Sequence, residues 1–163
     1  MSRGVKTISR SDRDIRVNLI PSGAVTFTGS PDLQSEEVTS YELGYRALPH
    51  SDIQISMSGF YSLYDHVRTI EGNTPVLMFG NKEGGKTWGG EIIAGLQLTT
   101  RWRGAIGYTY LREYLAADFE STDTRWGPFE LNDPKHQISI ESALELPHQT
   151  QLDVRARYVD ALP

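Results

Sequence analysis

Hydrophobic and polar residues alternate with a period of two along much of the chain. In residues 38–47, Tyr41, Leu43 and Tyr45 occupy every second position, and the positions between them are polar or glycine. Successive side chains of a β-strand point to opposite faces, so this pattern predicts a strand with one apolar face. Seven segments qualify as strands, and they are residues 15–20, 38–47, 53–58, 91–99, 105–114, 138–146 and 152–158.

The connections between these segments are of two kinds. Short turns are predicted at residues 48–51, 101–104 and 147–149, whereas residues 65–86 and 116–134 read as loops of about twenty residues. Short turns at one end of the strands and long loops at the other are typical of outer-membrane β-barrels. The pattern predicts an all-β fold, namely an antiparallel, up-and-down transmembrane β-barrel segment of about seven strands.

Composition narrows the choice of function. The chain has 163 residues, a formal net charge of -5 and no cysteine. Its lysines and arginines are scattered, which argues against nucleic acid as a partner. Without cysteine there is neither a disulfide framework nor a thiolate metal site. No run of eighteen apolar residues predicts a membrane-spanning helix, but the strands of a transmembrane barrel need only about 9 to 11 alternating residues.

The number of strands predicts that the chain is only part of a barrel. Bacterial single-chain barrels have an even number of strands, at least about eight, and the first residues of this chain lack the apolar run of a secretory signal. An open sheet edge in lipid leaves backbone groups unpaired at a cost of several kcal/mol each. We therefore expect a fragment of a larger protein.

Two motifs resemble those of a known family. Residues 29–46 read GSPDLQSEEVTSYELGYR, and residues 80–91 read GNKEGGKTWGGE. The first is similar to the N-P-x-L, K-P-E, S-Y-E-x-G strand-entry motif of TonB-dependent receptors, and the second to their N-x-G, T-x-G-x-E segment. Residues 6–10, KTISR, are similar to the family's R-T-P-S-R element. Ser35 and Ile8 stand where the family commonly has proline, Glu83 where it has glycine and Gly90 where it has valine.

The resemblance implies a fold and a function for the whole chain. Residues 1–163 would be a partial receptor β-barrel domain, without the plug domain and the closing strands. In the family, about 22 strands surround the plug. The implied function is TonB-dependent uptake of a siderophore-like chelate or another scarce nutrient across the outer membrane. The implied partners are outer-membrane lipid, the plug and remaining strands, the TonB system through the plug, and the small-molecule chelate.

The alternation also predicts which charged residues face a wet lumen, where charges are hydrated or paired with the plug. The lumen-facing candidates are Glu42, Arg46, Glu91, Glu141, Asp153, Arg155 and Arg157. Loops carry recognition, and the acidic second loop therefore offers candidate ligand contacts. These are Asp118, Glu120, Asp123 and Trp126, although the same residues suit a solvated loop.

Residues 80–87 also match the P-loop pattern of nucleotide-binding proteins. A phosphate-binding loop requires a helix to begin at Lys86 and Thr87, but Trp88, Gly89 and Gly90 follow, and paired glycines oppose helix nucleation. The context therefore favours a loop over a nucleotide site.

Other chemistry lacks a sequence signal. The four histidines, at positions 50, 66, 136 and 148, have no metal-ligand spacing, and no G-x-S-x-G elbow holds a nucleophilic serine. We therefore predict that the chain is not an enzyme and holds neither a cofactor nor a metal. The alternative of a different class is a soluble all-β module that binds a partner through its long loops.

Overall fold

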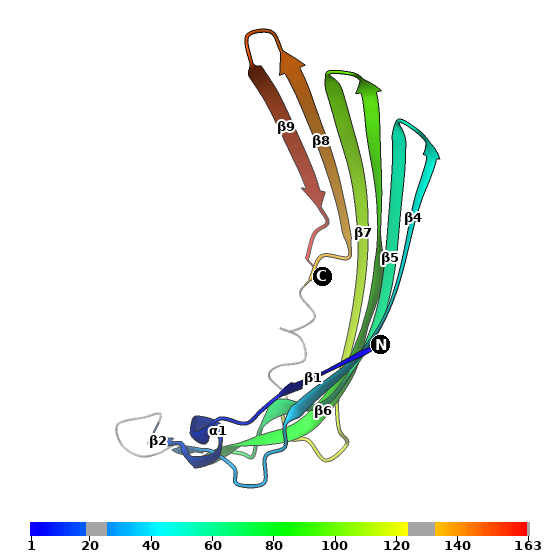
Figure 1. Ribbon diagram of the computed structural model, residues 1–163. Coiled ribbons are helices and arrows are strands. Elements are labelled where there is room, and N and C mark those ends of the chain that lie inside the picture. The colour runs from blue at the N-terminus through cyan, green and yellow to red at the C-terminus, as the bar shows by residue number, and fades with distance from the viewer. Residues whose placement is uncertain (19–25, 124–132, 163) are drawn as a thin grey trace. The chain divides into compact units, whose positions relative to one another are not determined.

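The structure is a computed structural model that describes residues 1–18, 26–123 and 133–162. It contains strands and one short helix (Figure 1). In chain order the elements are β1 (Ser2–Lys6), α1 (Arg10–Asp14), β2 (Arg16–Asn18), β3 (Thr26–Thr28), β4 (Glu36–His50), β5 (Ile53–Glu71), β6 (Val76–Thr99), β7 (Trp102–Ala117), β8 (His136–Leu146) and β9 (Thr150–Val159).

The strands form one nine-stranded sheet. Its main path follows the order β1-β4-β5-β6-β7-β8-β9, so that from β4 onward each strand pairs with the next one along the chain. The pairs β1–β4, β7–β8 and β8–β9 are antiparallel, and the short β3 pairs with β2 and runs parallel to β6. The predicted all-β, up-and-down sheet is confirmed.

The chain divides into two compact units, although β4 to β7 contribute to both. Unit 1 comprises Met1–Ser40, Ser62–Lys86 and Glu113–Leu131, and unit 2 comprises Tyr41–Tyr61, Thr87–Arg112 and Asn132–Pro163. Strands β4 to β7 are long, and each of them has residues in both units. β5 has 19 residues and β6 has 24, against the roughly 9 to 11 that a strand needs to cross a bilayer.

Unit 2 has an apolar face and a polar face, and the strand register defines both. Residues directly opposite each other in an antiparallel pair lie on the same face. The register aligns Ile106 with Ile140 and Ala156, which belong to the apolar face. One residue earlier, Ala105 aligns with Glu141 and Arg155, which belong to the polar face. The alternation in the sequence is therefore the alternation of the two faces.

The short turns lie at or within a few residues of the predicted positions, but one of the two predicted long loops does not exist. The structure has turns at residues 51–52, 100–101 and 147–149. The expected loop at residues 65–86 is wrong, because β5 runs to Glu71, β6 starts at Val76, and only residues 72–75 connect them. The glycines there serve strand pairing: a Cβ on Gly85 would lie 2.6 Å from the carbonyl oxygen of Tyr114.

The P-loop pattern is also explained by β6. Residues 80–87 are extended and paired within the sheet, so no helix follows them and no phosphate-binding loop forms. Among the described residues, none belongs to a helix that is long and apolar enough to cross a membrane.

Three elements near the N-terminus were not expected. β1 is polar apart from Gly4 and Val5, α1 is polar throughout, and β3 lies in a stretch that reads as loop. Of the first predicted strand, residues 15–20, β2 covers residues 16–18, and residues 19 and 20 lie outside the described part of the chain. Ion pairs explain β1, since Arg3 and Glu37 approach to 2.6 Å and Lys6 and Glu36 to 2.9 Å across its pairing with β4.

The sheet has almost no interior. Within the described residues Leu77 is the only buried apolar side chain, at 5% exposure, and several buried side chains are polar, including Thr69 and Glu83. Aliphatic residues of unit 2 are instead open, with Ile106 at 48%, Ile140 at 51% and Leu152 at 50%. A water-soluble sandwich would enclose such residues between its sheets.

Two glycines of β6 should respond differently to substitution by alanine. A Cβ on Gly89 would lie 2.2 Å from the carbonyl oxygen of Tyr110, whereas the nearest atom to a Cβ on Gly95 is at 3.9 Å. We expect Gly89→Ala to lower the free energy of unfolding by about 1–3 kcal/mol through overpacking. Gly95→Ala is the matched control and should be nearly neutral. Denaturant titration of the two variants measures this, and equal stabilities would contradict the close approach of β6 and β7.

Candidate functional site

The polar face of β8 and β9 holds four of the predicted lumen-facing residues. Glu141 and Arg155 are directly opposite and form an ion pair at 3.7 Å. Asp153 accepts a hydrogen bond from Gln151 at 2.8 Å, and Arg157 donates one to Gln137. The side chains of Glu141 and Arg155 remain 55% and 78% exposed, so their ion pair is hydrated and weak.

The other three predicted residues lie on β4 and β6. Glu91 accepts a hydrogen bond from the Thr109 hydroxyl at 3.3 Å, and Thr109 pairs with Gln137, so Glu91 belongs to the polar face. Arg46 lines a shallow hollow that Glu91 also lines. Glu42 is four residues before Arg46 on the same strand and has the same alternation, which places it on this face. The structure therefore brings all seven predicted residues to one face of the sheet.

The opposite face of unit 2 carries rows of apolar side chains. Ile106, Ile140 and Ala156 form one row across three strands, and Trp102, Leu144 and Leu152 form another. The hydroxyl of Ser142 is the polar exception in this region. It accepts a hydrogen bond of 3.0 Å from the indole nitrogen of Trp102, which satisfies both groups without water.

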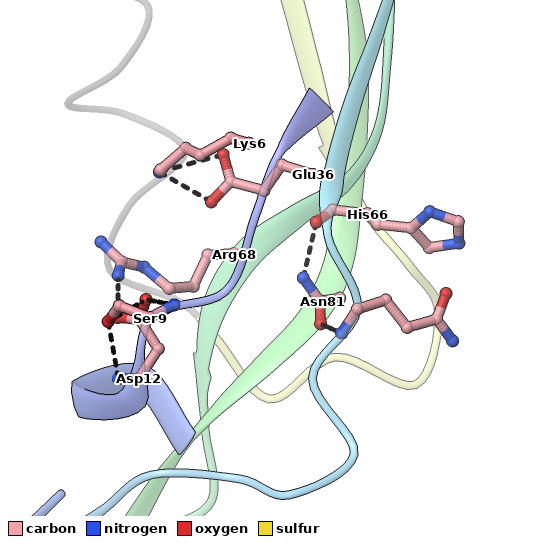
Figure 2. Close-up of polar contacts among 8 residues, drawn as sticks. Lys6, Ser9, Asp12, Glu36, His66, Arg68 and Asn81 are labelled. Atoms are coloured by element: carbon pink, nitrogen blue, oxygen red, sulfur yellow. Dashed lines mark hydrogen bonds and ion pairs between the residues drawn. The ribbon is translucent and has the colours of Figure 1, made fainter. Parts of the chain in front are cut away.

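The sequence motifs of residues 6–10, 29–46 and 80–91 meet in unit 1 (Figure 2). Lys6, in the motif of residues 6–10, binds both carboxylate oxygens of Glu36, at 2.9 and 3.1 Å. The backbone N–H of Gln34 donates to the Asn81 side chain at 2.6 Å, which joins the motif of residues 29–46 to that of residues 80–91. Asn81 in turn donates to the carbonyl oxygen of His66 at 2.6 Å. These motifs therefore have a structural role, because they fasten segments that are far apart in the chain.

The short helix α1 completes this arrangement. Ser9 and Asp12 form a capping box, in which the Ser9 side chain accepts from the Asp12 backbone and the Asp12 carboxylate accepts from the Ser9 backbone. Arg68 of β5 donates to the same carboxylate at 2.9 Å (Figure 2). Hydrogen bonds from Ser9 and the charge of Arg68 hold the pKa of Asp12 below its usual value.

A buried carboxylate that sequence analysis did not single out organises the tip of the β5–β6 hairpin. Glu71 is only 7% exposed. It accepts hydrogen bonds from the Ser121 hydroxyl at 2.7 Å and from the backbone N–H and hydroxyl of Thr122 at 2.7 and 2.9 Å. Residues 118–123 are thereby held against the hairpin, and we refer to this set of contacts as the Glu71 clasp. Glu71 and Ser121 are fifty residues apart in sequence, so no local sequence pattern reveals the clasp.

Hydrogen bonding determines the charge state of Glu71. Burial raises the pKa of this carboxyl, but hydrogen bonds from Thr122, Thr69 and Ser121 outweigh burial and lower the pKa to about 2. Such a group stabilises the folded state at any pH above its unfolded value of 4.5, and this contribution is lost as the pH falls from 4.5 towards 2.

Further hydrogen bonds hold three of the predicted ligand-contact residues, Asp118, Glu120 and Asp123, against β5 and β6. Asp123 accepts a hydrogen bond of 2.7 Å from the backbone N–H of Ile70, so its carboxylate has a structural role. The backbone N–H of Asp118 donates to the carbonyl oxygen of Lys82, and the Lys82 ammonium donates to the carbonyl oxygen of Glu120. Trp126 lies outside the described residues. In the part of the chain that the structure describes, no group of three or more histidine, aspartate or glutamate side chains is placed to hold a metal.

A sequence model of the family described as TonB dependent receptor-like, β-barrel matches residues 8–161. The chain belongs to this family. TonB-dependent receptor barrels are antiparallel sheets with a polar lumen and an apolar outer face, which agrees with the two faces of unit 2. No curated protein matches the chain.

Solved structures of two metal transporters and an outer membrane receptor share the fold of the chain. The FrpB iron transporter from Neisseria meningitidis (F3-3 variant) matches with a TM-score of 0.70 and 14% identity over 83% of this chain and 20% of that protein. The alcaligin outer membrane receptor FauA from Bordetella pertussis matches with a TM-score of 0.52 and 16% identity over 82% and 23% of the two chains. The copper transporter OprC matches with a TM-score of 0.54 and 14% identity over 89% and 20%. The chain thus spans about a fifth of the length of these proteins.

The Glu71 clasp should depend on the negative charge of its carboxylate. Glu71→Gln keeps the size of the side chain but cannot accept three hydrogen bonds with one oxygen, so the clasp should open at neutral pH. In the unchanged chain it should open between pH 4.5 and 2, with a loss on the order of 3 kcal/mol. The measurement is the hydrogen-exchange protection of the Ile70 and Gly72 amides. Glu120→Gln is the matched control, since only the backbone oxygen of Glu120 contacts Lys82. Equal protection in both variants would show that the carboxylate does not hold the loop.

Proposed function

We propose that the chain forms part of the barrel wall of an outer-membrane receptor that takes up a scarce nutrient with energy supplied through TonB. The observation that carries this proposal is the sheet of unit 2, which exposes rows of aliphatic side chains on one face and charged side chains on the other. Lipid is the surrounding that suits the first face and a wet lumen the one that suits the second. Membership of the TonB-dependent receptor family supports the same conclusion.

In this proposal the polar face lines the lumen and packs against a plug domain. Glu141, Arg155 and Arg157 are exposed on this face, where a plug or water can reach them. The mechanism is gated passage of a solute rather than the making or breaking of bonds. The polar face therefore supplies hydrated charges and shape, and no residue on it is assigned a catalytic role.

The proposed substrate is a metal chelate such as an iron–siderophore complex. Support comes from the similar structures, which are those of an iron transporter, an outer membrane receptor for alcaligin and a copper transporter. The proposed ligand contacts are Asp118, Glu120 and Trp126 on the β7–β8 connection, because loops at the outer end of a barrel meet the ligand first. Asp123 is proposed to hold this connection in place, since its carboxylate is bound to Ile70.

The alternative, a soluble all-β binding module, is less well supported. Such a module requires an enclosed apolar core, and the described residues bury one apolar side chain, Leu77. It would also leave a broad aliphatic surface in contact with water, which soluble monomers avoid.

Adjacent residues of β7 offer a direct test of the lipid-facing assignment. Ile106→Arg places a charge on the apolar face, and Ala105→Arg places the same charge on the polar face opposite Glu141. If lipid covers the apolar face, Ile106→Arg should destabilise the folded sheet by about 2–4 kcal/mol and reduce its amount in the outer membrane, whereas Ala105→Arg should be tolerated. Membrane fractionation and urea unfolding in lipid vesicles measure the two effects. The lipid assignment fails if both variants assemble equally well, or if the unchanged protein is monomeric and folded in buffer without detergent.

Uptake by cells tests the transport part of the proposal. Cells that produce the polypeptide containing this chain should accumulate radioactive iron supplied as a siderophore chelate, and removal of TonB should abolish that accumulation. Cells without the polypeptide are the control. Accumulation that is unaffected by loss of TonB, or absent with every metal chelate supplied, would refute the proposal while leaving the fold intact.

A further inference from the structure

The apolar face of unit 2 ends in a cluster of amphipathic side chains, which we call the rim cluster. Tyr108, Tyr110 and Arg112 follow Ile106 at every second position of β7 and so share its face. His136, at the start of β8, is directly opposite Tyr110, and Tyr158 of β9 is opposite Ile138, which pairs with Tyr108. These five residues, Tyr108, Tyr110, Arg112, His136 and Tyr158, form the rim cluster.

Four residues of the rim cluster contact one another through hydrogen bonds and a ring contact. The Tyr108 hydroxyl and Nδ1 of His136 are 2.8 Å apart, and Nε of Arg112 donates to the Tyr110 hydroxyl at 2.9 Å. The Tyr110 and His136 rings are close, with centroids 5.2 Å apart. Rings that face outward while their polar tips are satisfied suit the boundary between acyl chains and headgroups.

The length of the apolar face agrees with this boundary. The face begins at Trp102 and reaches Arg112 after about ten residue steps, which is about 34 Å along a strand at 3.4 Å per residue. A strand tilted by about 45° then spans about 24 Å across the membrane, close to the apolar band of about 25 Å in outer-membrane barrels. Trp102 and the rim cluster therefore mark the two edges of the band.

Arg112 stands at the outer limit of the rim cluster with unused donors. Its side chain is exposed, and its Nε atom is the one bound to Tyr110. Among the described residues no carboxylate forms an ion pair with it, so its charge is open to an anion from outside the chain. A guanidinium group presents two further NH₂ groups in a planar fork, which matches the oxygens of a phosphate.

We propose that Arg112, supported by the Tyr110 hydroxyl, binds the phosphate of an anionic lipid headgroup at the edge of the apolar band. This inference rests on the proposed function, because it requires the apolar face of unit 2 to lie in lipid. The occupant is a lipid rather than free phosphate, since the aliphatic rows below the rim cluster accommodate the acyl chains of the same molecule.

The test compares lipid selectivity in vesicles of phosphatidylcholine with and without phosphatidylglycerol. The whole polypeptide that contains the chain is reconstituted, and spin-labelled phosphatidylglycerol reports the fraction of lipid held at the protein surface. Arg112→Gln should lower the preference for phosphatidylglycerol by about threefold to tenfold, as expected for loss of one basic side chain at an anionic membrane surface. Arg103→Gln, on the polar face, is the matched control and should have no effect. Arg112→Lys keeps the charge but not the fork, and should retain part of the preference.

Three results would overturn the proposal. The first is an unchanged preference in Arg112→Gln, and the second is an equal loss of preference in Arg103→Gln. The third is loss of the preference when inorganic phosphate is added at constant ionic strength, which would indicate a general anion site. A spin label at Ile106→Cys in a cysteine-free background separates this proposal from the proposed function. A label shielded from aqueous quenchers with no effect of Arg112→Gln refutes only the lipid site, whereas a label open to water refutes the membrane assignment itself.

Discussion

Backbone hydrogen bonding between neighbouring strands is the constraint on which the structure depends. Because the described residues bury only Leu77 among their apolar side chains, a hydrophobic interior cannot be the main source of order. The strands are instead joined by continuous ladders, such as the nine and ten residue pairs that connect β8 to β7 and β9. In a surrounding without water every N–H and C=O group needs such a partner, which is why a paired sheet is one of the few architectures available there.

Side-chain contacts in unit 1 add to the backbone hydrogen bonds between strands. The pairs Lys6–Glu36 and Arg68–Asp12 and the hydrogen bond from Gln34 to Asn81 bring together segments from the N-terminus, β4, β5 and β6. The family motifs map onto these contacts, so their residue types are explained by assembly rather than by chemistry on a substrate. Glu71 has a similar role for the β7–β8 connection, where one carboxylate receives hydrogen bonds from two consecutive residues.

The sequence predicted unit 2 well because its two faces differ in polarity. Ile106, Ile140 and Ala156 are apolar and their neighbours polar, and that contrast is readable one strand at a time. The same contrast placed the seven charged candidates on one face. In unit 1, residues 65–86 contain four glycines, which are common in loops, and so they looked like a loop although most of them are strand. The Glu71 clasp was equally hidden, since it joins residues fifty positions apart.

The weakness of the Glu141–Arg155 contact has a consequence of its own. At 3.7 Å and with both side chains more than half exposed, the two charges neutralise each other while gaining less than about 1 kcal/mol from the pairing. Either residue can therefore exchange its partner for water or for another charged group at little energetic cost. The pair itself is neutral, so at this point the face neither retains an ion of one sign strongly nor repels it.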